Sequence, residues 1–163
     1  MDPSLLADDW SCKQNIDPLY NSCAISEETW LDCDHDTVYA LFIPGSIVWA
    51  KQHGYPWWPA IVDYDPDIAE YFLFENSADQ FPSKYHVAFL GKSVLRAWVC
   101  SSLLNPFQGT SPKGMNKKVK KNMRHKLECS IRMANEALSL GIPERIHKYG
   151  FSGRYGAKST EDV

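Results

Sequence analysis

Short apolar runs separated by turn residues fill the middle of the chain. Strand-forming residues occupy 46–51, 60–64, 71–74, 85–90 and 93–99, and glycine, proline or polar residues separate these runs. Runs of this length and spacing are typical of short antiparallel strands. The pattern therefore predicts a mainly β fold, built as a small antiparallel barrel.

The pattern changes to a helical period after residue 110. Apolar residues follow one another at intervals of 4, 4, 4, 4, 3 and 4 positions, which indicates an amphipathic helix. Gly141 and Pro143 end this helix, and a short second helix is expected to begin at Pro143. We expect residues 111–150 to be helical and packed on the barrel, and residues 151–163 to be a flexible tail. The predicted apolar stripe is Met115, Val119, Met123, Leu127, Ile131, Ala134 and Leu138.

Charge is distributed unevenly along the 163 residues, although the formal net charge is only −3. Residues 1–40 carry nine acidic residues and one basic residue, and residues 41–110 carry six and four. Residues 111–163 carry five acidic and twelve basic residues, a net charge of +7. A basic end of this kind favours polyanions such as nucleic acid, and the alternative is a solvated helix face.

Composition and motifs exclude several classes of protein. A content of 44% hydrophobic and 13% aromatic residues is not typical of a disordered chain. No apolar run approaches the ~20 residues of a membrane-spanning helix, so no membrane association is expected. The chain shows no nucleophile elbow, phosphate-binding loop or metal-binding helix motif, so we do not expect an enzyme. Asp63, Asp65 and Asp67 alternate around Pro66, which favours an exposed loop.

One motif near the first predicted strands resembles a known family. Residues 54–60 read Gly-Tyr-Pro-Trp-Trp-Pro-Ala, which is similar to the signature of the PWWP domain. Residues 45–51 resemble the family's first strand and residues 85–91 its third, so the resemblance covers residues 41–110. It implies a five-stranded antiparallel barrel of the Tudor-like group followed by C-terminal α-helices, with no cofactor. Members of this family read methylated lysine on histone tails and bind DNA without sequence preference.

By position in the motif, the resemblance assigns an aromatic cage to Tyr55, Trp58 and Phe89. A trimethylammonium group has no N–H to donate, so aromatic faces bind it by cation–π attraction. The alternative is ordinary core packing, because Phe89 shares its strand parity with Tyr85 and Val87.

The resemblance and the charge pattern together imply a nuclear chromatin reader that acts as a monomer. The expected partners are the trimethylated tail of histone H3, most often at lysine 36, and nucleosomal DNA. DNA contact should be weak, sequence-independent and dependent on salt. The alternative is a DNA- or protein-interaction scaffold without methyl-lysine recognition. The candidate DNA-binding residues are Lys51, Lys117, Lys118, Lys120, Lys121 and Arg124.

Residues 1–36 resemble the C-terminal half of a CW-type zinc finger, which points to the CW-type and PWWP-domain family. Cys12 and Cys23 match the third and fourth zinc ligands of that finger, and Glu28 and Trp30 match its late pocket positions. A structural zinc site needs four protein ligands. Zinc is therefore expected only with a complete finger, and we expect this acidic segment to be loosely ordered.

Overall fold

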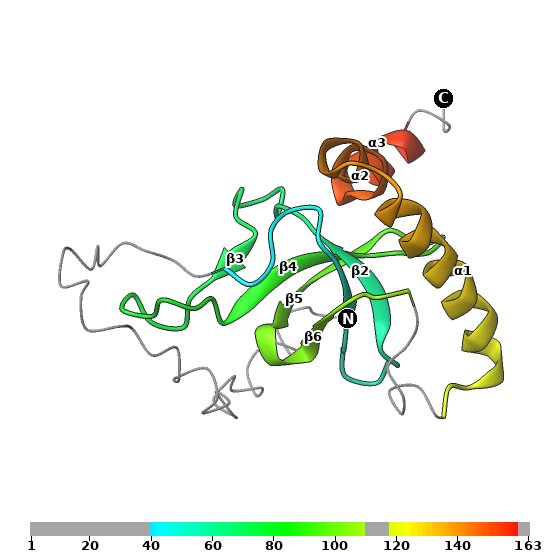
Figure 1. The fold of residues 1–163 in the computed structure, drawn as a ribbon, viewed down its shortest axis with the longest axis horizontal. Coiled ribbons are helices and arrows are strands. Elements are labelled where there is room, and N and C mark those ends of the chain that lie inside the picture. Colours follow the sequence, from blue (N-terminus) through cyan, green and yellow to red (C-terminus); the bar gives the residue numbers. More distant parts are fainter. Residues whose placement is uncertain (1–39, 110–117, 160–163) are drawn as a thin grey trace.

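The computed structural model describes residues 40–109 and 118–159, and in this part of the chain strands come first and helices follow (Figure 1). The 3-10 helix η3 (Ser101–Leu103) joins the last two strands. The strands are β1 (Ile47–Ala50), β2 (Trp58–Val62), β3 (Phe72–Leu73), β4 (Lys84–Phe89), β5 (Leu95–Cys100) and β6 (Leu104–Pro106). The helices are α1 (Lys121–Leu138), α2 (Ile142–Tyr149) and α3 (Phe151–Ser159).

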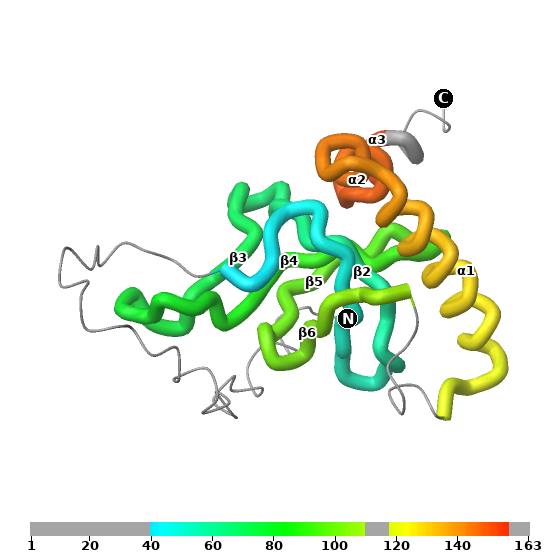
Figure 2. The backbone as a smooth tube through the Cα atoms, viewed as in Figure 1, coloured from blue at the N-terminus to red at the C-terminus, as the bar shows by residue number. Residues whose placement is uncertain are grey.

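The strands form one curled antiparallel sheet. β4 pairs with β2, β3 and β5, and β1 pairs with β2 and β6. Because η3 turns the chain directly after β5, β6 reaches the far edge of the sheet beside β1, a path that can be followed in Figure 2. This arrangement confirms the antiparallel architecture for the five predicted runs, of which 71–74 contains only the two-residue β3, and adds β6, a strand that the sequence pattern did not predict.

Alternation along the strands divides the buried residues between two faces of the sheet. The inner face forms one core cluster, composed of Phe42, Val48, Ala50, Ala60, Val62, Tyr85, Val87, Phe89, Val99 and Leu104. The outer face and the helices form a second cluster, composed of Ile47, Trp49, Ile61, Ala88, Leu90, Phe107, Leu127, Ala134, Ala137 and Tyr149.

Helix α1 covers the outer face and lies against β2 and β1 (Figure 1). Leu127 and Ala134 are buried, as the predicted stripe requires, but Leu138 is 41% exposed. Ser130 and Ala137 are buried as well, so the contact face is turned toward these small residues, which let the helix approach the sheet closely. The helix also begins later than predicted, because the backbone of Lys120 is extended (φ −58°, ψ 142°).

Helices α2 and α3 lie together beside the end of α1 (Figure 1). The expectation of a flexible tail from residue 151 is wrong for the described part, because α3 occupies Phe151–Ser159. Glycines make the close contact between the two helices possible: a Cβ on Gly153 would lie 1.9 Å from the carbonyl oxygen of His147. Glycines in this region are also the reason why the sequence predicts a flexible tail there.

The expectations for residues 1–36 lie outside the described residues, as does Lys117. Within the described residues, no helix is long and apolar enough to cross a membrane.

Candidate functional site

The three aromatic residues of the predicted cage lie at one end of the sheet. Trp58 begins β2 and Phe89 ends β4, and these strands run antiparallel with Ala60 opposite Phe89. Trp58 therefore lies diagonally across from Phe89 on the same face of the sheet. Tyr55 lies in the loop of residues 51–57, which joins β1 to β2 at this end.

A hydrogen bond fixes the orientation of Trp58. Its indole Nε1–H donates to the carbonyl oxygen of Leu90 at 2.7 Å, in the turn of residues 90–94 that joins β4 to β5. The backbone N–H of Leu90 donates in turn to the carbonyl oxygen of Pro59 at 2.9 Å. The first residues of β2 and the β4–β5 turn are thus tied together through both a side chain and the backbone.

The three rings differ in exposure. Tyr55 is 56% exposed, Trp58 is half-buried and Phe89 is only 8% exposed. Phe89 also belongs to the inner core cluster, so packing accounts for most of its surface. Tyr55 and Trp58 are the rings that a ligand could reach most easily.

The sequence of this region decides the family. Residues 45–139 match the family model of the PWWP domain, and this stretch contains the sheet and α1. The chain belongs to the PWWP domain family. The resemblance seen in residues 54–60 is thereby confirmed, whereas α2 and α3 lie beyond the matched stretch.

Curated relatives of this PWWP domain chain include two that match nearly its whole length. The chain is 51% identical over 163 residues to zinc finger CW-type PWWP domain protein 1 of Mus musculus, covering 99% of this chain and 26% of that protein. It is 47% identical over 161 residues to the protein of the same name from Homo sapiens, covering 98% and 25%. It is 30% identical over 108 residues to the human histone-lysine N-methyltransferase, H3 lysine-36 specific, covering 62% and 4%. The chain thus spans about a quarter of the length of the first two relatives.

The side chain of Lys51 makes hydrogen bonds to the backbone of the loop of residues 51–57. Lys51 is half-buried, and its ammonium group donates to the carbonyl oxygen of Gln52 at 3.2 Å and to that of Tyr55. The N–H of Tyr55 donates to the carbonyl oxygen of Gln52 at 3.1 Å. The predicted DNA-binding residue therefore has a structural role in shaping the loop that carries Tyr55.

A group of exposed basic side chains lies where α1 begins in this PWWP domain. Its members are Lys118, Lys120, Lys121 and Arg124, and none of them makes an ion pair with a described residue. No acidic side chain lies in the first turn of α1, so the helix dipole adds to this positive charge. We call these four residues the basic cluster.

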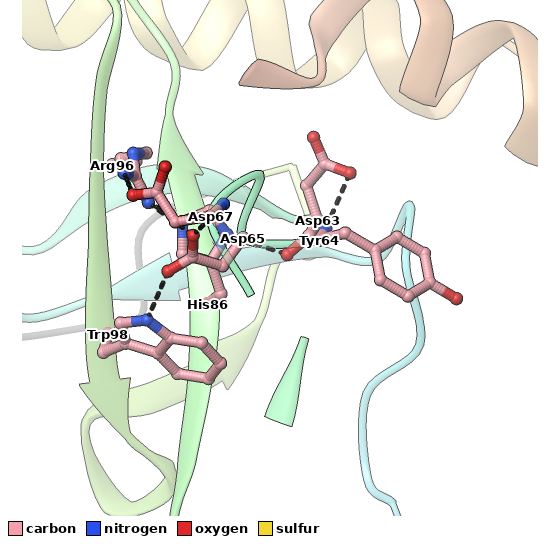
Figure 3. Close-up of polar contacts among 7 residues, drawn as sticks. All are labelled: Asp63, Tyr64, Asp65, Asp67, His86, Arg96 and Trp98. Atoms are coloured by element: carbon pink, nitrogen blue, oxygen red, sulfur yellow. Dashed lines mark hydrogen bonds and ion pairs between the residues drawn. The ribbon is translucent and has the colours of Figure 1, made fainter. Parts of the chain in front are cut away.

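A buried polar cluster occupies the other end of β2, and sequence reasoning missed it (Figure 3). Asp63 and Asp65 are 6% and 5% exposed, so the expectation of an exposed loop is wrong for both. Asp65 accepts the indole N–H of Trp98 at 2.7 Å and forms an ion pair with Arg96 at 2.9 Å. Arg96 also pairs with the exposed Asp67 at 2.6 Å, so β5 supplies the partners that bury the loop. Burial alone would raise the pKa of Asp65, but the N–H of Asp67, Trp98 and the charge of Arg96 lower it overall.

His86 lies fully buried beside this cluster. Its Nδ1 lies 2.8 Å from the carbonyl oxygen of Asp63, which requires a proton on Nδ1. Its Nε2 lies 3.4 Å from a guanidinium nitrogen of Arg96, which can donate to it. Burial lowers the pKa of His86 because the charged imidazolium would lose its hydration, and the nearby Asp65 carboxylate opposes this only in part.

The polar cluster borders a pocket of about 390 Å³ between the loop after β2 and helices α2 and α3. Tyr64, Ile146 and His147 line it, so it lies away from the aromatic end of the PWWP domain. No group of three or more His, Cys, Asp or Glu side chains that could hold a metal occurs among the described residues. Cys12 and Cys23, the candidate zinc ligands, lie outside these residues.

Proposed function

We propose that this chain is a chromatin reader in the nucleus, which binds trimethyl-lysine on a histone H3 tail through Tyr55, Trp58 and Phe89. The observation that carries the proposal is the locked indole of Trp58, which lies on one sheet face with Phe89 beside the loop that presents Tyr55. An aromatic ring held in a fixed orientation binds a cation without losing further rotamer freedom.

We propose different roles for the three rings because their exposures differ. Tyr55, at 56% exposure, and the half-buried Trp58 form the accessible walls, while Phe89, at 8% exposure, forms the floor. The methyl groups of the ligand would lose water against these rings, and the positive charge would face their negative π surfaces.

The relatives support lysine 36 of histone H3 as the target. One of them is named as a histone-lysine N-methyltransferase that is H3 lysine-36 specific, so a related sequence occurs in a protein named for this residue. The family resemblance supports the same choice.

Peptide titration tests this proposal. We expect the chain to bind a trimethylated lysine-36 peptide of histone H3 more tightly than the unmodified peptide, measured by calorimetry. Trp58→Ala should remove this preference, because each aromatic face contributes about 0.5–2 kcal/mol to binding a cation. If the Trp58→Ala variant keeps the full preference, the reader assignment is wrong.

A matched pair of tyrosines separates binding from stability. Tyr55 and Tyr64 are 56% and 48% exposed, but only Tyr55 lies at the aromatic end. Tyr55→Ala should weaken binding of the methylated peptide, and Tyr64→Ala should leave it unchanged. Equal effects of the two substitutions would contradict the assignment.

We propose nonspecific DNA contact as a second function of the same molecule. The basic cluster supports it, because its four side chains are exposed and make no ion pair with described residues. Phosphate contacts of this kind release counterions, so affinity falls steeply with salt. We leave Lys51 out of this surface, because its ammonium group already donates to loop carbonyls.

The salt dependence of DNA binding tests the second function. Replacing all four residues of the basic cluster by alanine should flatten the slope of log affinity against log salt by up to about 3–4, because each lost phosphate contact contributes about 0.9. Lys148→Ala on α2, an exposed lysine outside the cluster, should change the slope by less than about 1. An unchanged slope in the fourfold variant would refute this contact.

A further inference from the structure

The backbone of the β4–β5 turn is held from several elements at once. The carbonyl oxygen of Leu90 accepts both the indole N–H of Trp58 and the hydroxyl of Ser130 on α1, each at 2.7 Å. The turn also passes through Gly91, whose φ of +140° is a conformation that side chains rarely permit. The turn directly follows Phe89 in the chain, and its Leu90 carbonyl oxygen fixes the indole of Trp58.

Arg154 on α3 contacts further carbonyl groups in this turn and beside it. Its guanidinium donates to the carbonyl oxygen of Phe89 at 2.6 Å, to that of Gly91, and to that of Ser93 at 3.2 Å. No carboxylate of a described residue pairs with it, since both ion pairs among these residues involve Arg96. Burial accordingly lowers the pKa of Arg154, as expected for a charged group withdrawn from water and compensated only by carbonyl dipoles.

Helix α3 is itself fixed at its first residue. The N–H of Phe151 donates to the buried carboxylate of Asp63 at 2.9 Å, and the guanidinium of Arg96 lies 5.3 Å from the centre of the Phe151 ring. A Cβ on Gly150 would lie 2.7 Å from the same carboxylate, so glycine is needed there. The polar cluster at one end of the sheet thus anchors the helix that reaches the turn at the other.

We infer that Arg154 is a positioning residue for the aromatic site, acting through the β4–β5 turn on Phe89 and Trp58. The inference rests on the proposed function, since it concerns the same rings. Arg154 lies beyond residues 45–139, the stretch that matches the family model, so the β4–β5 turn is held in part by a residue outside that stretch. Without it, the carbonyl groups of Phe89, Gly91 and Ser93 lose this donor, and the rings must be ordered when the ligand binds.

A matched pair of arginine variants tests this inference. Arg145 on α2 has the same kind of contacts, since its guanidinium donates to the carbonyl oxygens of Ala137, Gly45 and Leu140 at 2.8–2.9 Å. Those contacts do not touch the β4–β5 turn. Arg154→Met should weaken binding of the trimethylated peptide about 5- to 20-fold, whereas Arg145→Met should lower the melting temperature and leave binding within about twofold.

A second readout reports on the turn directly. The indole N–H of Trp58 gives an NMR signal, assigned by its loss in a Trp58→Phe variant, and its exchange with water should accelerate in Arg154→Met but not in Arg145→Met. Arg154→Lys offers one nitrogen in place of two donating nitrogens and should give an intermediate loss of binding. This lysine variant also serves if the methionine variant does not fold.

The outcomes separate the two proposals. A wild-type chain without preference for the methylated peptide refutes the proposed function. Wild-type affinity for the methylated peptide in Arg154→Met overturns the positioning role alone, and so does wild-type affinity in Arg154→Lys if the methionine variant does not fold. Equal losses of binding in the Arg154 and Arg145 variants would overturn it too, because they would reflect general destabilisation.

Discussion

Acid should destabilise this domain through His86. The imidazole is fully buried, and its pKa is lowered from the ordinary value of 6.5 mainly by burial. The groups that face it are the Asp63 carbonyl group, the Asp65 carboxylate and the Arg96 guanidinium. The unfolded chain binds a proton at His86 near pH 6.5, whereas the folded chain resists it. The contribution of His86 is therefore fully present above pH 6.5 and is lost as the pH falls toward the lower pKa of the folded state.

The size of this effect follows from the linkage relation. Between pH 7.5 and pH 5.5, one histidine that stays neutral in the folded chain and titrates at 6.5 when unfolded removes up to about 1 kcal/mol of unfolding free energy. For a chain of this size, that corresponds to about 2–4 °C in melting temperature.

Denaturation by guanidinium chloride at several pH values, monitored by tryptophan fluorescence, measures this loss of unfolding free energy. His86→Asn should flatten the pH dependence in this range, because the side-chain amide can still donate to the Asp63 carbonyl group but does not titrate. His147→Asn, on the exposed part of α2, is the control for the substitution itself. A His86→Asn variant that keeps the wild-type pH dependence would refute this reasoning.

Two further substitutions test the packing of α1 and the β4–β5 turn. Leu127→Ala should lower the unfolding free energy by about 2–5 kcal/mol in urea denaturation, because the side chain is 7% exposed, while Leu138→Ala at 41% exposure should cost far less. Gly91→Ala should cost about 1–3 kcal/mol in the same assay, because φ is +140° and the new Cβ would lie 3.1 Å from Oγ of Ser130. Gly141→Ala, with φ −64° and open space, is its control, and equal costs for the two glycines would contradict the argument.

The strands and the family could be predicted because their signals are local. Turn residues separate the apolar runs, and residues 54–60 carry the family motif in one uninterrupted stretch. Short connections explain the pairing of β1 with β2 and of β4 with β5, whereas β2 pairs with β4 and β1 with β6 across longer stretches of chain. The candidate cage residues Tyr55, Trp58 and Phe89 came from the family resemblance, and these three residues lie at one end of the sheet.

The polar cluster and α3 could not be predicted because their causes are distant in sequence. Asp65 looked like a loop residue, and only Trp98 and Arg96, some thirty positions later, explain its burial. Residues 151–159 contain glycines that favour flexibility locally, but contacts with Asp63 and the β4–β5 turn fix them as a helix. Tertiary contacts outweighed local propensity in both places.

The contacts of α2 and α3 also have a consequence for the order of folding. Arg145 reaches Gly45 across 100 positions, Phe151 reaches Asp63 across 88, and Arg154 reaches Phe89 across 65. During synthesis, the strands leave the ribosome well before these partners exist, and contacts between distant positions form slowly. The nascent sheet therefore lacks the guanidinium contacts to the carbonyl oxygens of Phe89, Gly91 and Ser93 until residue 154 emerges. The C-terminal helices complete the aromatic end of a fold whose strands were made first.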